Sequence, residues 1–330
     1  MPTPRRLVRV LAPFLLVSVS VLVGLVLAEG ALRVLRPHGT LRSAHELPWM
    51  NTLPHVRTIF TVDPEFGFRP VLPSKLYDRH GILHAEYDTT DVDSERILFL
   101  GDSVTANGKI LRATREACGR DDVEYLNAGV GSFNTLQEIA YYRRYAHRTE
   151  PDHVVLTFNM NDVETTPVVF REDDGNLRVF ATFAPYEDVN LFLYRHSYVY
   201  RLYLGLRYPR DSRLEDVLGD IDDGFASLSD ELARAGVDFT VLVLPLSLPR
   251  AQWSARDVRV YEDVIAMLHT HGIEHLDLRP TLDEAAEAQL PLAPSAGDLF
   301  HVTEDLAALY GRELATHITS CRTDSQETSE

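Results

Sequence analysis

A serine, a histidine and a carboxylate fall at places in the sequence where they could act together on an acyl group. Ser103 follows the apolar run Ile97 to Leu100 and the tight-turning Gly101, which together predict a nucleophile on a strand-to-helix elbow. Asp298 and His301 stand three residues apart before the last helical segment. That spacing lets the carboxylate hold one imidazole nitrogen while the other faces a serine. Serine chemistry also needs oxyanion donors, which the rest of the chain must supply.

The elements that must position these residues follow a repeated strand-and-helix pattern. Apolar runs predict five strands, and helical segments lie between them or follow them. Such alternation favours a parallel sheet covered on both faces, which is an α/β fold class. The strands are expected at 97–100, 123–127, 153–158, 237–246 and 273–278, and the helices at 109–118, 134–145, 213–235, 255–270 and 303–319.

Three short blocks in this frame resemble the catalytic blocks of the SGNH/GDSL hydrolase superfamily. Gly101-Asp102-Ser103 resembles the nucleophile block, Asn159-Met160-Asn161-Asp162 the block that contributes an asparagine, and Asp298-x-x-His301 the block with the acid and base. The resemblance covers residues 96–319. It implies a three-layer α/β/α, flavodoxin-like domain and a serine esterase that needs neither a metal nor another cofactor.

The resemblance also implies an oxyanion hole, with two departures from the usual pattern. Its donors would be the N–H of Ser103, a backbone N–H at Gly131 or Ser132, and the side-chain amide of Asn161. The family's Asn-x-x-x-x-Gly pattern, laid on Asn127, puts Ser132 where glycine is expected, so the register between Gly131 and Ser132 stays open. Asn159 replaces another glycine, and asparagine tolerates the left-handed conformation that such a glycine could serve.

The N-terminal segment is long and apolar enough to cross a membrane. Val10 to Ala28 holds no charged residue and would span about 28 Å as a helix, close to the roughly 30 Å of a bilayer core. Arginines at positions 5, 6 and 9 precede it, so the positive-inside rule favours a cytoplasmic N-terminus and a periplasmic or extracellular body. A cleaved signal peptide ending at Val26-Leu27-Ala28 is the alternative.

The chain divides into an anchor, a linker and one large domain. We expect a cytoplasmic stub and membrane anchor at 1–30, a juxtamembrane linker and N-terminal flap at 31–95, the hydrolase domain at 96–320 and a polar tail at 321–330. Residues 163–212 interrupt the strand-and-helix pattern and are rich in aromatic side chains. They are interpreted either as a lid over the substrate groove or as an ordinary helix that packs Leu191, Tyr194, Tyr198 and Leu202.

The distribution of charge and the spacing of possible metal ligands indicate which kinds of partner and metal the chain does not bind. The formal net charge is −17, and because residues 1–40 carry five arginines against Glu29, the acidic excess lies in the body, which repels nucleic-acid phosphates. The acidic cluster Asp88, Asp91 and Asp93 lacks the pattern of an EF-hand loop. The histidines at 269, 271 and 275 match no zinc motif, so no metal site is predicted there.

The only two cysteines, Cys118 and Cys321, are interpreted either as a disulfide or as one buried small hydrophobic residue and one exposed thiol in the tail. In flavodoxin-like order, the helices after the first and last strands lie on the same face of the sheet and end at the same side. Cys118 ends the first of these helices and Cys321 follows the second. A body outside the cytoplasm would let the disulfide persist.

The sequence leaves three functions open. The main one is a serine ester hydrolase outside the cytoplasm that acts on O-acylated, for example acetylated, carbohydrate or on lipid. The second is an O-acyltransferase that passes the acyl group to an envelope polysaccharide. The third is a non-catalytic, membrane-anchored carbohydrate-binding module, against which the intact Ser103, Asn161, Asp298 and His301 argue.

Overall fold

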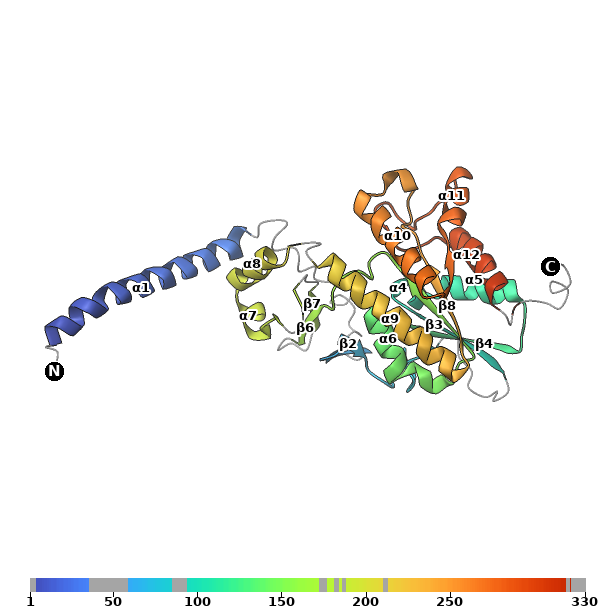
Figure 1. Cartoon of the computed structure of the whole chain (residues 1–330), viewed down its shortest axis with the longest axis horizontal. Coiled ribbons are helices and arrows are strands. Elements are labelled where there is room, and N and C mark those ends of the chain that lie inside the picture. The colour runs from blue at the N-terminus through green and yellow to red at the C-terminus, as the bar shows by residue number, and fades with distance from the viewer. Residues whose placement is uncertain are drawn as a thin grey trace.

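A parallel sheet of five strands forms the centre of the molecule (Figure 1). The structure is a computed structural model, and it describes residues 4–35, 59–84, 94–171, 177–180, 184–185, 188–209, 213–318 and 321. The strands run in the order β4-β3-β5-β8-β9, which is the flavodoxin-like order expected from the sequence. They are β3 (Glu95–Gly101), β4 (Val123–Gly129), β5 (His153–Phe158), β8 (Asp238–Val243) and β9 (Glu274–Asp277).

Helices cover both faces of this sheet. The connection from β3 to β4 runs one way across the sheet and those to β5, β8 and β9 run the other way, so right-handed crossovers put their helices on opposite faces. On one face α5 (Lys109–Cys118) packs along α12 (Glu304–His317), with α11 (Arg279–Glu287) beside α12. On the other face α9 (Leu214–Ala235) packs between α6 (Thr135–Arg144) and α10 (Ala255–Thr270). The described part of the domain also contains 3₁₀ turns at Ala146–Thr149 and Arg250–Gln252.

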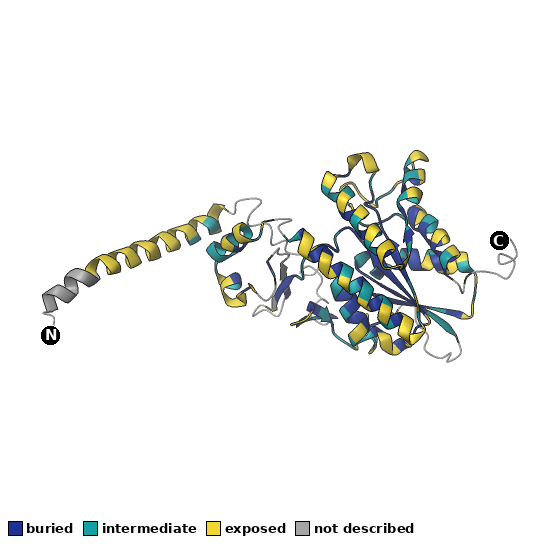
Figure 2. Cartoon of the chain, viewed as in Figure 1, coloured by how far each residue is buried: buried dark blue, intermediate teal, exposed yellow. Residues whose placement is uncertain are grey.

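The core lies between the sheet and its helices, where Figure 2 shows most of the central strands buried. β5 is buried along its whole length, as a central parallel strand should be. The apolar stripe of α9, spaced at three and four residues, turns inward to meet it. That stripe consists of Val217, Ile221, Phe225, Leu228 and Leu232.

The described part of the predicted flap, residues 59–84, belongs to this core. β1 (Phe60–Asp63) and β2 (Gly67–Pro70) form an antiparallel hairpin, and Phe66 and Phe68 are fully buried. Phe66 stacks on Phe133 with ring centroids 5.8 Å apart. The hairpin therefore fixes the loop between β4 and α6. The acidic cluster at 88, 91 and 93 lies outside the described residues.

The insertion after β5 contains a hairpin and two helices in place of the one helix considered above. β6 (Val168–Arg171) pairs with β7 (Leu177–Phe180), and α7 (Leu191–His196) is followed by α8 (Tyr198–Arg207). Ser197 breaks the helical run, because its extended backbone and its hydroxyl cap the start of α8.

The N-terminal helix α1 (Pro4–Leu35) extends away from the domain. Residues 12–35 are long and apolar enough to cross a membrane, and none of that segment is buried in the structure. Its last turns contact α8, and Arg33 also donates a hydrogen bond to the carbonyl of His196 at the end of α7.

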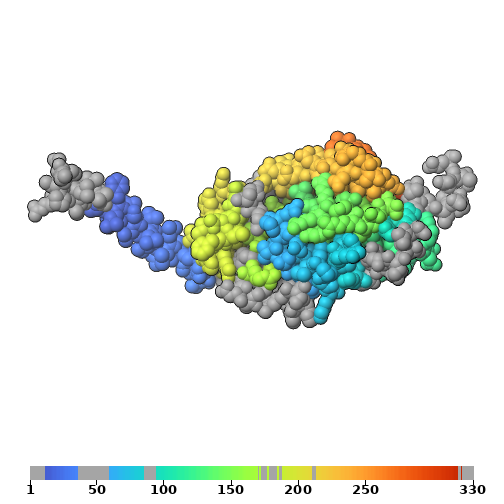
Figure 3. All heavy atoms as spheres, turned by 90° about the horizontal axis from the view of Figure 1, so that it is seen from below, coloured from blue at the N-terminus to red at the C-terminus, as the bar shows by residue number. Residues whose placement is uncertain are grey.

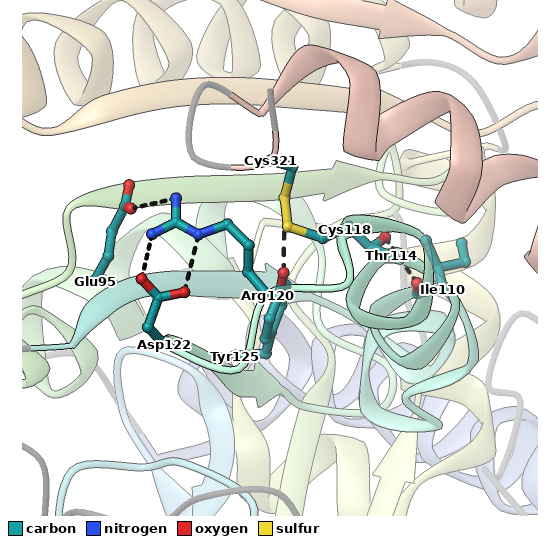
Figure 4. Close-up of a disulfide and its surroundings, with 8 residues drawn as sticks. All are labelled: Glu95, Ile110, Thr114, Cys118, Arg120, Asp122, Tyr125 and Cys321. Atoms are coloured by element: carbon teal, nitrogen blue, oxygen red, sulfur yellow. Dashed lines mark hydrogen bonds and ion pairs between the residues drawn. A yellow bond between two sulfur atoms is a disulfide. The ribbon is translucent and has the colours of Figure 1, made fainter. Parts of the chain in front are cut away.

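Cys118 and Cys321 form the disulfide (Figure 4). Their Cα atoms are 4.9 Å apart, within the range that a disulfide allows. The close packing of α5 on α12 brings them together. A Cβ at Gly311 would lie 2.5 Å from the Cβ of Ala113, so only glycine permits this approach.

Candidate active site

Ser103 starts the four-residue helix α4 (Ser103–Ala106) directly after β3. The buried Asp102 caps this helix, because its Oδ1 accepts the N–H of Val104 at 2.8 Å. The helix lies so close to the sheet that a Cβ at Gly101 would come within 2.0 Å of the Thr105 hydroxyl. Asn127 of β4 also holds it, since its side-chain amide donates to the carbonyl of Thr105 at 2.8 Å. Ser103 is therefore held on a short, tightly packed turn, as the elbow pattern predicts.

His301 and Asp298 meet Ser103 across 198 residues of sequence. His301 Nε2 lies 2.9 Å from Ser103 Oγ, and His301 Nδ1 lies 3.0 Å from Asp298 Oδ2. An ionised carboxylate only accepts hydrogen bonds, so Nδ1 carries the imidazole proton and Nε2 is free to accept the serine proton. The expected contact between Ser103 and His301 is confirmed.

Asp298 is held ionised in this arrangement. Partial burial by itself would raise its pKa, but the backbone N–H groups of His301 and Phe300 and the His301 ring bond the carboxylate and lower its pKa below the ordinary value. The Asp298 carboxylate can therefore orient the imidazole and stabilise its protonated form.

Three contacts fix the segment that carries His301. The Lys109 ammonium, at the start of α5, donates to the carbonyl of Val302 at 2.9 Å. The N–H of Ser247, after β8, donates to the carbonyl of Leu299 at 2.8 Å. Thr303 caps α12 and its hydroxyl donates to the carbonyl of Pro291. The segment that carries His301 is thus hydrogen-bonded to α5, to the loop after β8 and to the loop after α11.

Ser132, and not Gly131, occupies the left-handed position in the loop after β4. Its φ is +65°, and the N–H of Phe133 closes the turn on the carbonyl of Val130. Serine therefore stands where a glycine conformation is required, at the position where the resemblance expects glycine. Within the described part of the chain, neither the N–H of Ser132 nor that of Ser103 donates a hydrogen bond.

Asn159 does not adopt the left-handed conformation that the sequence comparison considered for it. Its side chain is used instead. The side-chain oxygen Oδ1 of Asn159 accepts the N–H of Met160, and Asn159 Nδ2 lies 3.5 Å from the buried carboxylate of Asp102. Asn161 donates to the same Asp102 oxygen from Nδ2 at 3.1 Å, which leaves its second N–H available. Asp102 thus connects the nucleophile block to the asparagine block.

Two more carboxylates lie buried behind this connection. Asp162 accepts the N–H of Asn159 and the Thr135 hydroxyl, while neither oxygen of Glu138 has a hydrogen-bond partner among the residues that the structure describes. Burial, followed by the charges of Asp162 and Asp102, raises the pKa of Glu138 well above its ordinary value. Burial also raises the pKa of Asp162. Burial and these neighbouring charges therefore favour the protonated form of Glu138.

The histidines at 269, 271 and 275 lie far along the chain from this cluster and have other contacts. His269 and His275 pack edge to face with ring centroids 4.5 Å apart. His271 Nε2 lies 2.8 Å from Asp222 Oδ1 on α9. Within the described residues, no group of three or more His, Cys, Asp or Glu could hold a metal ion.

The sequence predicts Ser103, Asn161, Asp298 and His301 as site residues but gives no role to the polar groups packed against them. Asp102 was quoted only as part of a motif, and Lys109, Asn127 and Glu138 were given no site role. The sequence offers a reason to suspect a role for Asp102 and Asn127, because each is a polar residue within or directly after an apolar strand. It offers no such reason for Glu138, because a glutamate in the first turn of a helix is ordinarily exposed.

The chain is similar to several solved structures. A search of protein-family models and a search of curated proteins each gave no match. The acetylxylan esterase Axe2 from Geobacillus stearothermophilus is 13% identical, with a TM-score of 0.47 over 71% of this chain and 97% of that one. LAE5, an alpha/beta hydrolase from the metagenome of Lake Arreo, is 13% identical, with a TM-score of 0.47 over 69% and 97%. A putative GDSL-like lipase from Parabacteroides merdae is 10% identical, with a TM-score of 0.46 over 71% and 100%.

Proposed function

We propose that this chain is a serine ester hydrolase of the SGNH/GDSL type, anchored to a membrane by α1, with its catalytic domain outside the cytoplasm. The observation that carries the proposal is the continuous path from Ser103 Oγ to His301 and on to Asp298, at 2.9 and 3.0 Å. The path lies where β3 and β5 end, beside the point at which the strand order reverses. Open α/β sheets place their ligand crevice at that point.

The reaction proceeds by acyl transfer through Ser103. His301 Nε2 takes the serine proton as Oγ attacks the ester carbonyl, and Asp298 stabilises the imidazolium. The protonated His301 then gives its proton to the departing alcohol. Water attacks the acyl-serine in the same way, which releases the acid and restores Ser103.

The oxyanion formed in each step is stabilised by donors from three adjacent strand ends. The N–H groups of Ser103 and Ser132 and the second amide N–H of Asn161 serve this role. Asp102 orients Asn161 by accepting its first N–H. Removing one such donor typically costs about 3 to 4 kcal/mol of barrier.

The substrate we propose is an acyl ester, such as an acetyl ester, on a carbohydrate polymer or a lipid. The side chains of His301 and Asp298 are 37% and 22% exposed, so an ester carried on a large molecule can reach them. A surface groove of about 550 Å³ runs alongside Asp298 and Leu299, and loops after β8 and α11 line it. This groove gives a polymer room beside the reacting group.

Covalent labelling tests the nucleophile. A fluorophosphonate probe should label the full chain in detergent, and it should fail to label Ser103→Ala. Ser295→Ala removes an exposed serine near the groove and serves as the matched control, which should label like the wild type. Labelling of Ser103→Ala at the wild-type rate would refute the proposal.

Turnover separates the remaining functions. The wild-type enzyme, not treated with the probe, should release acetate from p-nitrophenyl acetate and from acetylated oligosaccharides, with water as acceptor. Acetate that appears only on an added sugar, with no net release, would make the protein an O-acyltransferase. Absence of both labelling and turnover in a folded protein would leave the carbohydrate-binding module.

A further inference from the structure

The exposed apolar side chains of the domain are concentrated on one small part of it. Outside α1, seven large hydrophobic residues are exposed in the described part of the chain, and five of them lie on α7 and α8. Phe192 is 70% exposed and Leu206 is 67% exposed. Such a concentration marks an interaction surface. The five are Leu191, Phe192, Leu193, Tyr203 and Leu206, and we call them the apolar patch.

The apolar patch is not the unfinished core of a loose segment. The two helices have a small core of their own, in which Tyr194 and Leu204 are buried against Val168 and its neighbours. Arg201 binds the helices together, because its guanidinium donates to the carbonyl of Tyr194 and lies over the Tyr194 ring. The side chains of the apolar patch therefore stay exposed although the two helices already have a packed core.

The helix pair is joined firmly to the end of α1. The carboxylate of Glu29 accepts hydrogen bonds from the Ser197 hydroxyl and from the N–H groups of Tyr198 and Val199, each at 3.0 Å. Glu29 therefore caps α8 together with Ser197. Arg33 adds a hydrogen bond to the carbonyl of His196 at 2.7 Å. Figure 3 shows residues 190–208 as a mass against the end of α1.

The place along α1 at which α7 and α8 are attached indicates what the apolar patch contacts. Glu29 is the first charged residue after the uncharged stretch Val10 to Ala28, so it marks the level at which α1 leaves the hydrocarbon. α7 and α8 are held at that level, where aromatic and aliphatic side chains fringed by arginine are favoured. Arg195 and Arg207 provide such a fringe.

We propose that α7 and α8 lie in the interface of the membrane that α1 crosses, with the apolar patch among the lipid headgroups and upper acyl chains. This inference rests on the proposed anchoring by α1. The insertion leaves the sheet after β5, at the same edge as Ser103. The interfacial contact therefore holds the catalytic edge close to the membrane surface and selects esters that are presented there.

Site-directed spin labelling tests the contact. Because both native cysteines are bonded to each other, single cysteines can be introduced and labelled on the full chain. The variants are Phe192→Cys and Leu206→Cys on the patch, Val21→Cys in α1, and Leu76→Cys as the matched control. Leu76 is a 46% exposed leucine outside the insertion. Each labelled protein is placed in nanodiscs of equimolar phosphatidylcholine and phosphatidylglycerol, and its accessibility to oxygen and to a nickel chelate is measured.

We expect the oxygen-to-nickel ratio at Phe192 and Leu206 to be several-fold above that at Leu76 and below that at Val21. A ratio at the patch equal to that at Leu76, with a high ratio at Val21, would overturn the interfacial contact and leave the anchor intact. A low ratio at Val21 would overturn the anchor itself. Labels at the patch that are shielded from both reagents and that broaden each other would overturn the lipid contact in favour of a second copy of the chain.

Discussion

The ammonium of Lys109 lies 2.9 Å from the carbonyl oxygen of Val302, the residue that follows His301. Lys109 begins α5, six residues after the nucleophile, so this bond couples the two halves of the proposed catalytic pair. It is a charge-assisted bond, of a kind that contributes about 1.5 to 3 kcal/mol.

We expect Lys109→Met to lower kcat about tenfold, which corresponds to about 1.4 kcal/mol of barrier, with little change in KM. The loss is expected because His301 would be held less firmly in position. For the same reason, the pH at which half of the activity is lost should change. Lys75→Met changes the only other lysine, which is exposed, and should leave both parameters unchanged. Lys109→Arg should restore part of kcat. An equal loss in both methionine variants would contradict the positioning role.

Asp298→Asn should lower kcat by about 10³- to 10⁴-fold while the protein stays folded. An amide at this position favours the wrong imidazole tautomer and cannot stabilise the imidazolium. Asp305→Asn, an exposed acid in the first turn of α12, is the control. Steady-state hydrolysis of p-nitrophenyl acetate measures both, and similar losses in the two variants would contradict the assignment.

Ser132→Gly should raise the free energy of unfolding by about 0.5 to 1 kcal/mol, because it relieves the left-handed backbone at φ +65°. The backbone N–H is retained, so kcat should not fall. Ser132→Ala keeps both the strain and the N–H, and should match the wild type in both respects. A large loss of kcat in both variants would show that the Ser132 hydroxyl, and not its N–H, is required.

Glu138→Gln should stabilise the protein at neutral pH more than at acidic pH. The folded-state pKa of Glu138 is raised by burial, so between the unfolded and folded pKa values the unfolded chain releases a proton that the native state keeps. Stability is therefore lost as the pH rises, by about 1.4 kcal/mol for each unit of pKa difference. Glutamine does not titrate, so Glu138→Gln should remove this dependence of stability on pH.

Urea unfolding of the full chain in detergent at about pH 5 and pH 8 measures the effect. The advantage of Glu138→Gln over the wild type should grow with pH. Glu287→Gln, an exposed glutamate on α11, should show no such trend. A difference that is the same at both pH values would contradict the raised pKa.

Replacing both cysteines by serine should lower the free energy of unfolding by up to about 4 to 5 kcal/mol, because the disulfide closes a loop of some 200 residues. Activity at 25 °C should persist as long as the protein is folded, since the bond lies at the ends of α5 and α12 that are remote from Ser103. Thermal melting with and without reductant provides the comparison. A reductant-insensitive wild type would show that the bond does not form in solution.

The sequence by itself determined the parts of this protein that depend on local pattern. Buried parallel strands are continuous apolar runs and helices carry apolar stripes, so the five strands and their main helices could be predicted, and the resemblance to the SGNH/GDSL superfamily implied the flavodoxin-like order. Ser103, Asp298 and His301 were identifiable because the carboxyl ends of parallel strands lie at one edge of a sheet. The pairing of Cys118 with Cys321 followed from the same strand order.

Tertiary structure alone decided which residues support these groups. Lys109 reaches Val302 and Glu29 reaches Ser197 across long stretches of chain, and no periodicity records such contacts. Burial raises the pKa of Glu138, because a carboxylate in the first turn of a helix is ordinarily solvated and here it is enclosed. The left-handed backbone of Ser132 also came from tertiary structure, since φ is set by the turn that the packed loop must make and not by the residue type alone.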